Sequence, residues 1–288
     1  VSADFPLFEI NETKIRKTYL DFFLKYYNLK EFLSKDSKGT TNRQRIVAKD
    51  FLNLEIPLPS LEYQDIAIER LKKQQEILIN INKTLHSLKE GFIEQIIFDD
   101  LTKPDFIKIE TLSKSTQYGM TQSVMPEVKG IPFIRITDID SFGRIIYNEL
   151  PQISASKDDV VKYKVNEGDL LVARSGSIGK CAVVGKTDTD TVFASYLIRF
   201  VLDKKKVEPK YVLYYLLSNK GQSELQERAT KMTQTNINAN QISSIEIPVP
   251  SLEEQKEIIN KIGEKQMLIE ILEKNQANEK KTIDSIIN

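Results

Sequence analysis

The chain of 288 residues has little cysteine and histidine, with Cys181 and His86 as the single examples of each. One cysteine forbids an internal disulfide, and the two residues together are too few for the ligand spacings of zinc sites. Lysine and arginine number 41, and aspartate and glutamate also number 41, so the formal net charge is zero. No global field therefore draws the chain to nucleic acid or to an anionic membrane, and a site for either must be a local patch.

Long apolar segments are also missing. No apolar run approaches the roughly 18 residues of a membrane span, and no charged and then apolar leader opens the chain. We therefore expect a soluble, cytoplasmic protein without a membrane partner. The 40% of apolar residues is enough to bury the core of one large domain or two ordinary ones. The first residue is Val1 rather than methionine, which suggests a piece of a longer protein.

Catalytic motifs are the third absence. The segment Arg174–Cys181 resembles a phosphate-binding loop, but Arg174 stands where that loop needs glycine and Cys181 where it needs a hydroxyl. No glycine-rich loop follows a strand in the manner of a site for S-adenosylmethionine or a dinucleotide. His86 lies between leucines of a predicted helix and is interpreted as a solvated helix residue. We expect no catalytic residue, no metal site and no cofactor site.

An internal repeat is what the chain does have. Ile56–Gln64 (IPLPSLEYQ) recurs as Ile247–Gln255 (IPVPSLEEQ), at an offset of 191 residues. Upstream, Lys17–Leu24 aligns with Pro209–Leu216 at an offset larger by one. The simplest interpretation is a tandem pair of one unit, in which the first copy lacks its opening portion. A period this long indicates a protein with two-fold pseudo-symmetry rather than a solenoid.

Each copy is predicted to end in a long helix. Ser60 and Ser251 follow an extended Pro-x-Pro segment and suit the N-cap position. Residues 61–97 contain no proline and would make a rod of about 55 Å. Their apolar residues recur at the spacing of a coiled-coil seam, which consists of Leu71, Leu78, Ile81, Leu85, Leu88 and Phe92. Residues 252–287 carry a weaker series that Gln266 and Gln276 interrupt. The alternative is a core helix of one globular domain.

The pattern between these helices changes to that of strands. Strands are predicted at 131–136, 170–173, 180–184 and 195–201, and a helix at 211–226. The fold class expected is therefore α+β, with β-rich globular modules joined by long helices that form an antiparallel coiled coil.

Three loops stand out because they contain no acidic residue. They are residues 37–49, 172–187 and 228–245. Their basic and amide side chains can contact phosphates and base edges, so they predict a local nucleic-acid footprint on a neutral chain. Solvated loops of no special role are the alternative. The DNA-contacting residues that we predict are Arg43, Arg45, Arg135, Arg174, Ser175, Ser177, Lys180, Lys231, Gln234 and Asn236.

The order of these features resembles the target-recognition module of type I restriction-modification DNA specificity subunits. The segments that carry the resemblance follow one another along the chain as GIPFIR at 130–135, GDLLVARSGSIG at 168–179, QTNI at 234–237 and IPVPSLEEQ at 247–255. The resemblance implies four parts. Residues 1–55 are the C-terminal remnant of a first recognition domain, 56–98 a first helical spacer, 99–246 a complete second recognition domain, and 247–288 a second helical spacer.

The resemblance also implies the function. Such a subunit catalyses nothing, reads one half of a bipartite double-stranded DNA target with each recognition domain, and docks modification (methyltransferase) subunits, which a restriction subunit joins. S-adenosylmethionine and ATP are then expected only on the partner subunits. Within the DNA face, Arg174 and Asn236 are expected to contact guanine and adenine, and the lysines to hold phosphates. The alternative function is a non-catalytic coiled-coil scaffold with β-rich modules that bind proteins.

Overall fold

The computed structural model describes residues 7–26, 52–53, 55–99, 101, 104–122, 130–229 and 236–287. The chain divides into two compact units, which we call the helical unit (within residues 1–88, with 269–288) and the sheet module (residues 89–268). Helix α11 contributes to both units, and each unit is described here by itself. No helix in the described part of the chain is long and apolar enough to cross a membrane.

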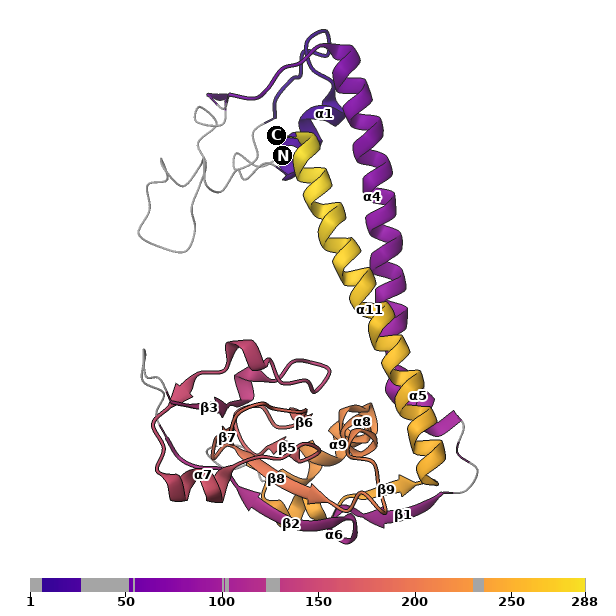
Figure 1. Ribbon diagram of the computed structural model, residues 1–288. Helices are drawn as coiled ribbons and strands as arrows, with labels where there is room; N and C mark the ends of the chain where they lie inside the picture. The colour runs from indigo at the N-terminus through magenta and orange to yellow at the C-terminus, as the bar shows by residue number, and fades with distance from the viewer. Residues whose placement is uncertain are drawn as a thin grey trace. The chain divides into compact units, whose positions relative to one another are not determined.

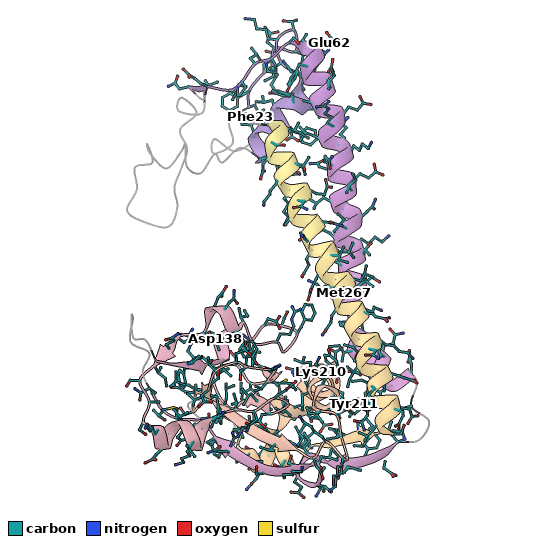
Figure 2. All side chains as sticks on the ribbon, viewed as in Figure 1. Phe23, Glu62, Asp138, Lys210, Tyr211 and Met267 are labelled. Carbon is teal, nitrogen blue, oxygen red and sulfur yellow. The ribbon has the colours of Figure 1, made fainter. Side chains whose placement is uncertain are left out.

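Among its described residues, the helical unit contains α1 (Lys17–Tyr26), α4 (Leu61–Lys89) and the last part of α11 (Leu252–Ile287) (Figure 1). Its core joins Phe22 and Phe23 of α1 to Leu71 of α4 and Ile283 of α11 (Figure 2 labels Phe23). Further along, the side chain of Gln276 donates a hydrogen bond to that of Asn82. Because residue numbers rise along α4 as they fall along α11, the two helices are antiparallel, as predicted.

The first rod is shorter than the sequence predicted. Helix α4 ends at Lys89, and a second helix, α5 (Phe92–Asp99), follows it. Between them Gly91 has a φ of 62°, the left-handed conformation that ends a helix and that glycine adopts without strain. The uninterrupted helix of 29 residues is about 44 Å long rather than 55 Å. The prediction failed because a single glycine in an apolar series was not taken as a helix end.

The sheet module contains strands in three groups and several short helices. A four-stranded antiparallel sheet has the order β2-β8-β5-β6, a three-stranded sheet has the order β4-β3-β7, and β1 pairs with β9 (Figure 1). The strands are β1 (Asp105–Lys108), β2 (Ser113–Tyr118), β3 (Ile131–Ile134), β4 (Gln152–Ile153), β5 (Leu170–Ala173), β6 (Cys181–Val183), β7 (Val192–Phe193), β8 (Leu197–Leu202) and β9 (Glu246–Val249). The helices are α6 (Ile109–Leu112), α7 (Lys157–Tyr163), α8 (Pro209–Leu217), α9 (Asn219–Arg228) and α10 (Ala239–Ser243), besides α5 and the first part of α11.

The core of the module confirms the predicted strands. Strand β5 has four fully buried residues, and two of them, Leu171 and Ala173, belong to one core cluster with Phe193 and Leu197. The single helix predicted at 211–226 is instead two helices, α8 and α9, because Ser218 interrupts it. The Ser218 hydroxyl accepts a hydrogen bond from the Gly221 amide at 3.1 Å and so caps the second helix.

The internal repeat is also seen in two equivalent sets of hydrogen bonds, one around Gln64 and one around Gln255. We call them the first clamp and the second clamp. In the first clamp, the buried Gln64 side chain donates to the carbonyls of Lys14 (3.0 Å) and Pro59 (2.9 Å) and accepts from the Arg16 amide (2.7 Å). Each clamp thus fastens the start of its long helix to the turn before a shorter helix, which is α1 in the first copy.

The second clamp repeats this arrangement within the sheet module. The buried Gln255 side chain donates to the carbonyls of Lys206 (3.5 Å) and Pro250 (2.8 Å) and accepts from the Glu208 amide (2.8 Å). The turn that it holds precedes α8. The offsets are 191 residues for the glutamines and 192 for the turns, which are the offsets of the sequence repeat.

Candidate nucleic-acid interface

The candidate interface lies at one end of the four-stranded sheet. Tyr118 is the last residue of β2 and is paired with Ile198 of β8, while Ala173 at the end of β5 is paired with Leu197. Antiparallel pairing therefore brings the end of β2, the end of β5 and the start of β8 to the same edge. The loop between β5 and β6, one of the three acid-free loops, begins there at Arg174.

Backbone hydrogen bonds hold the beginning of this loop. The Arg174 amide donates to the carbonyl of Tyr196 at 2.9 Å, and the Arg174 carbonyl accepts from the Ile237 amide at 2.8 Å. Ser175 and Asn236 form an isolated antiparallel bridge. Two acid-free loops that are distant in the sequence thus meet at Arg174, as a shared DNA face requires.

The side chain of Arg174 has no ion-pair partner within the described ranges. Its Cζ lies 5.0 Å from the centre of the Tyr118 ring, and its Nε is buried without a hydrogen-bond acceptor. The Tyr118 hydroxyl accepts a hydrogen bond from the Ala239 amide at 3.1 Å, which fixes the ring. The guanidinium therefore lies against an aromatic face, while its two Nη groups have no hydrogen-bond partner among the described residues.

Two other arginines of the module are engaged. The Arg135 guanidinium donates to Asp138 at 2.8 Å and 3.0 Å, and this hydrogen bond raises the pKa of Arg135. Arg199 donates to the Lys164 carbonyl and to the Gln117 side chain. Arg135 is therefore held by an ion pair, whereas Arg174 has none among the described residues.

The remaining predicted contacts fall into three groups. Ser177 is exposed and Asn236 is half-buried, so both can reach a ligand. Ser175 is only 4% exposed, and the Lys180 ammonium donates to the carbonyls of Ile136 (3.1 Å) and Ile139 (2.8 Å). Those two residues thus stabilise the loop. Four predicted contacts lie outside the described residues, namely Arg43, Arg45, Lys231 and Gln234.

Two exposed tyrosines at this edge escaped the sequence analysis. Tyr118 is 40% exposed and Tyr196 is 57% exposed. Strand β2 (SKSTQY) has no alternation of apolar residues that would have predicted a strand ending at Tyr118. Tyr196 lies in a turn between two buried strands, and its neighbours gave no reason to assign it a role. Pairing of distant strands brings the Tyr118 ring and the Tyr196 backbone to Arg174.

Cys181, which pairs with Val172 beside this edge, is poorly suited to act as a nucleophile. Cys181 is fully buried, and burial raises the pKa of its thiol to about 12, so the thiolate needed for nucleophilic or metal chemistry is absent near neutral pH. Among the described residues, no group of three histidine, cysteine, aspartate or glutamate side chains could hold a metal ion.

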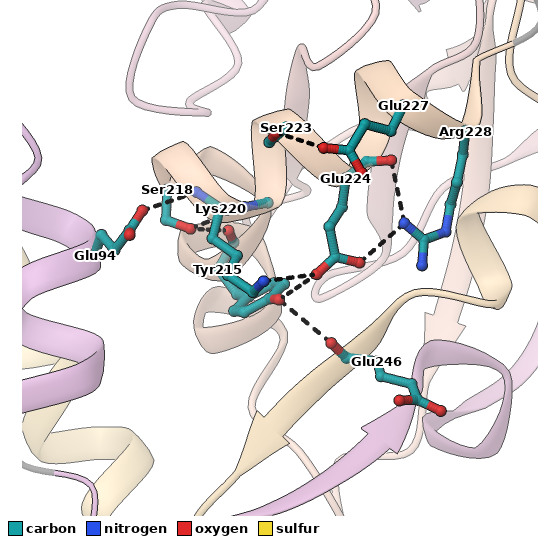
Figure 3. A network of polar contacts seen from close by, with 10 residues as sticks. Glu94, Tyr215, Ser218, Lys220, Ser223, Glu224, Glu227, Arg228 and Glu246 are labelled. Carbon is teal, nitrogen blue, oxygen red and sulfur yellow. Dashed lines mark hydrogen bonds and ion pairs between the residues drawn. The ribbon is translucent and has the colours of Figure 1, made fainter.

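A polar cavity of about 640 Å³ occupies another part of the sheet module (Figure 3). Four glutamates line it, against the cationic side chains of Lys220 and Arg228. Glu224 accepts from the Tyr215 hydroxyl at 3.0 Å and pairs with Arg228 at 3.0 Å, and Glu94 accepts from the Lys220 amide at 2.8 Å. The excess of negative charge makes this cavity unsuitable for phosphates, so it is not a candidate DNA site.

Comparison with known proteins adds a family match. A model described as the type I restriction modification DNA specificity domain matches residues 106–279. The chain is 25% identical over 295 residues to the specificity subunit of the type I restriction enzyme MjaVIII from Methanocaldococcus jannaschii. The alignment covers 93% of the chain and 68% of that relative. It is 24% identical over 305 residues to the EcoBI specificity subunit from Escherichia coli, and that alignment covers 94% of the chain and 63% of the relative.

Solved structures share the fold. The S subunit of a type I restriction-modification system from M. genitalium matches with a TM-score of 0.60 at 13% identity, over 96% of this chain and 73% of that one. A chain from a structure concerned with the assembly and conformational transition of the type I R-M system matches with a TM-score of 0.62 at 18% identity, over 96% and 71%. The α+β fold class predicted from the sequence is confirmed.

Proposed function

The chain belongs to the type I restriction modification DNA specificity family, and from this premise we propose that its sheet module reads one half of a bipartite double-stranded DNA target. The observation that carries the proposal is the Arg174 guanidinium, which lies in an acid-free loop without a carboxylate partner among the described residues. We keep the boundaries 99–246 for the complete recognition domain as part of the proposal. Strand β9, which pairs with β1, begins at the second of these boundaries and continues to Val249.

Each residue of the edge has a proposed role. Arg174 donates two hydrogen bonds to O6 and N7 of a guanine, and Asn236 contacts an adenine. Ser177, exposed in the same loop, donates to a phosphate. Lys231, Gln234, Arg43 and Arg45 stay as proposed contacts on sequence grounds alone. For Arg135, Ser175 and Lys180 we propose support of the reading loop, because their side chains are buried or already bonded.

The helical unit is proposed to act as a spacer and as a docking site for modification subunits. Three isoleucines of its paired helices are exposed, Ile66 (45%) and Ile79 (64%) on α4 and Ile271 (51%) on α11. We propose that methyl transfer, and DNA cleavage by a restriction subunit, take place on those partners, and that S-adenosylmethionine and ATP bind there. Residues 1–55, proposed as the C-terminal part of a first recognition domain, are assigned to the other half-site.

The proposal is tested by DNA binding of this chain to duplexes with a randomised central segment, followed by sequencing of the bound fraction. We expect a preferred sequence that contains guanine, and an affinity that falls steeply with added salt. Arg174→Ala should lose about 1–3 kcal/mol of discrimination at that guanine. Arg144→Ala is the matched control, because Arg144 is already paired with Asp140 at 2.7 Å. Binding that ignores sequence would contradict the proposal and favour the scaffold alternative.

A further inference from the structure

The Arg174 guanidinium needs a fixed orientation to distinguish bases. Two parallel hydrogen bonds to a guanine edge require the plane of the guanidinium to lie close to the plane of the base. An arginine side chain has many rotamers, so an unsupported one would lose conformational entropy on binding and would tolerate other bases. The feature that orients Arg174 therefore contributes to specificity.

We propose that Tyr118 is the positioning residue that holds Arg174 in its base-reading orientation. This inference rests on the proposed function. The Arg174 Cζ lies 5.0 Å from the centre of the Tyr118 ring, and no side chain in the described ranges forms an ion pair with Arg174. The Arg174 Nε is buried without a hydrogen-bond acceptor, so the contact with the ring face is the interaction that we assign to positioning the guanidinium.

Tyr118 is itself fixed at two points. Its backbone is at the end of β2, in register with Ile198 of β8, and its hydroxyl accepts from the Ala239 amide at 3.1 Å. Ala239 begins α10, whose N-cap Asn238 accepts from the Gln241 amide at 2.9 Å. A ring anchored by both a sheet and a capped helix turn is a rigid platform, and rigidity is what an orienting residue requires.

A second arginine over an aromatic ring shows why this pair is different. The Arg144 Cζ lies 5.1 Å from the centre of the Phe142 ring, but its guanidinium also donates to Asp140 at 2.7 Å. There the carboxylate orients the guanidinium and uses its donors. At Arg174 the ring orients the group and leaves its donors for a ligand. Phe142 is therefore a matched control position.

The experiment measures sequence preference rather than affinity alone. The full chain and its variants are each bound to duplexes with a randomised central segment, and the bound fractions are sequenced. The variants are Tyr118→Leu, Tyr118→Phe, Arg174→Ala, Phe142→Leu and the double variant Tyr118→Leu with Arg174→Ala. Tyr118→Leu should lower the preference for the guanine assigned to Arg174 by about threefold to tenfold. Tyr118→Phe, which keeps the ring, should retain most of it, and Phe142→Leu should retain all of it.

The double variant supplies a readout that a general loss of structure would not give. If Tyr118 acts through Arg174, then Tyr118→Leu should cause no further loss of preference once Arg174→Ala is present. An unchanged guanine preference in folded Tyr118→Leu would overturn the inference and leave the proposed function standing, as would equal weakening of all sequences. Where Tyr118→Leu fails to fold by circular dichroism, Tyr118→Met takes its place. Failure of the unchanged chain to enrich any sequence would instead overturn the proposed function and this inference with it.

Discussion

The first and second clamps are the same device in two different surroundings. In the second copy, β9 pairs with β1 and the Pro248 carbonyl accepts from the Tyr211 hydroxyl at 2.8 Å. In the first copy, residues 55–60 form no strand within the described chain, yet every hydrogen bond of Gln64 has its counterpart at Gln255. The clamp is therefore a local structure that does not depend on the sheet beside it.

The two clamps differ in the sign of their ion pairs. Beside Gln64, Arg16 pairs with Asp65 at 2.9 Å, and beside Gln255, Glu208 pairs with Lys256 at 4.0 Å. Acid and base have exchanged places between equivalent positions. An exchanged pairing, in which the turn of one copy met the long helix of the other, would place Arg16 against Lys256 and Glu208 against Asp65. Two like-charge contacts oppose such an exchange, which the shared glutamines would otherwise permit.

Loss of a clamp glutamine should have the largest effect. Gln64→Ala leaves the carbonyls of Lys14 and Pro59 and the amide of Arg16 without partners, at a cost of about 2–4 kcal/mol of unfolding free energy. Gln255→Ala should cost less, because its bond to Lys206 is longer at 3.5 Å. Urea unfolding measures the loss.

Hydrogen exchange locates that loss and tests whether each clamp is local. Gln64→Ala should speed amide exchange in α1, and Gln255→Ala should speed it in α8, with the other helix unchanged in each case. The control is Gln64→Glu, which keeps the size and the acceptor but sets a carboxylate against two carbonyls, so it should also destabilise. Faster exchange in both helices from either variant would show that the clamps are not independent.

Removal of the N-caps should have the next largest effect. The Ser60 hydroxyl accepts from the Tyr63 amide, and the Ser251 hydroxyl from the Glu254 amide, both at 3.3 Å. Replacement of either serine by alanine should therefore cost about 1 kcal/mol, and replacement by glycine only a few tenths. Equal losses in thermal or urea unfolding would confirm that the caps are equivalent, whereas a loss at one serine alone would break the equivalence.

Exchange of the charges should have a smaller effect with a clear sign. Arg16→Glu faces Asp65 with a like charge and should lower stability, and the double variant Arg16→Glu with Asp65→Lys, which copies the polarity of the second clamp, should restore it. Both side chains are exposed at 39% and 53%, so the change is a modest shift of the urea midpoint that salt reduces. A double variant no better than Arg16→Glu would show that this pair has no role.

Acidity provides a second test of the same pair. The hydrogen bond from Arg16 lowers the pKa of Asp65 below its ordinary value of 3.8. A lowered pKa in the folded state stabilises the protein fully above that ordinary value, and the contribution is lost as the pH falls through the lowered value. The difference in stability between the unchanged chain and Asp65→Asn should therefore shrink as the pH falls below 3.8.

The repeat shows which parts of the molecule the sequence could predict. The N-caps, the strand at 170–173 and the antiparallel helices follow from local patterns, namely proline and serine positions, an apolar run and a heptad spacing. The helix ends at Lys89 and Leu217 were missed, because Gly91 and Ser218 interrupt patterns that otherwise continue. Single residues that change the backbone direction are weaker signals than a repeated spacing.

The candidate site could be predicted only in part for a different reason. The acid-free loops identified Arg174 and Asn236, which the structure brings together through the bridge between Ser175 and Asn236. Tyr118 could not be found, because its relation to Arg174 depends on the register of β2 against β8 and of β8 against β5. Nothing in the sequence separated Arg135 and Lys180 from Arg174 as predicted DNA contacts. No local pattern reveals that Arg135 pairs with Asp138 or that Lys180 binds two carbonyls.

The smallest predicted effect is a gain of stability from making the first N-cap like the second. At the second, the Glu254 carboxylate also accepts from the Ser251 amide at 2.9 Å, which completes a capping box, and hydrogen bonds from Ser251 lower the pKa of Glu254. At the first, Tyr63 holds the position of Glu254 and is 56% exposed, so its removal loses little buried area. Tyr63→Glu should raise the urea midpoint slightly near neutral pH.

Because the box lowers the glutamate pKa, the gain should disappear as the pH falls below the ordinary value of 4.5. Tyr63→Gln forms the same box without a charge, so its gain should not depend on pH. Equal behaviour of the two variants at both pH values would show that the carboxylate does not reach the Ser60 amide, and that the two copies differ at this cap by more than one side chain.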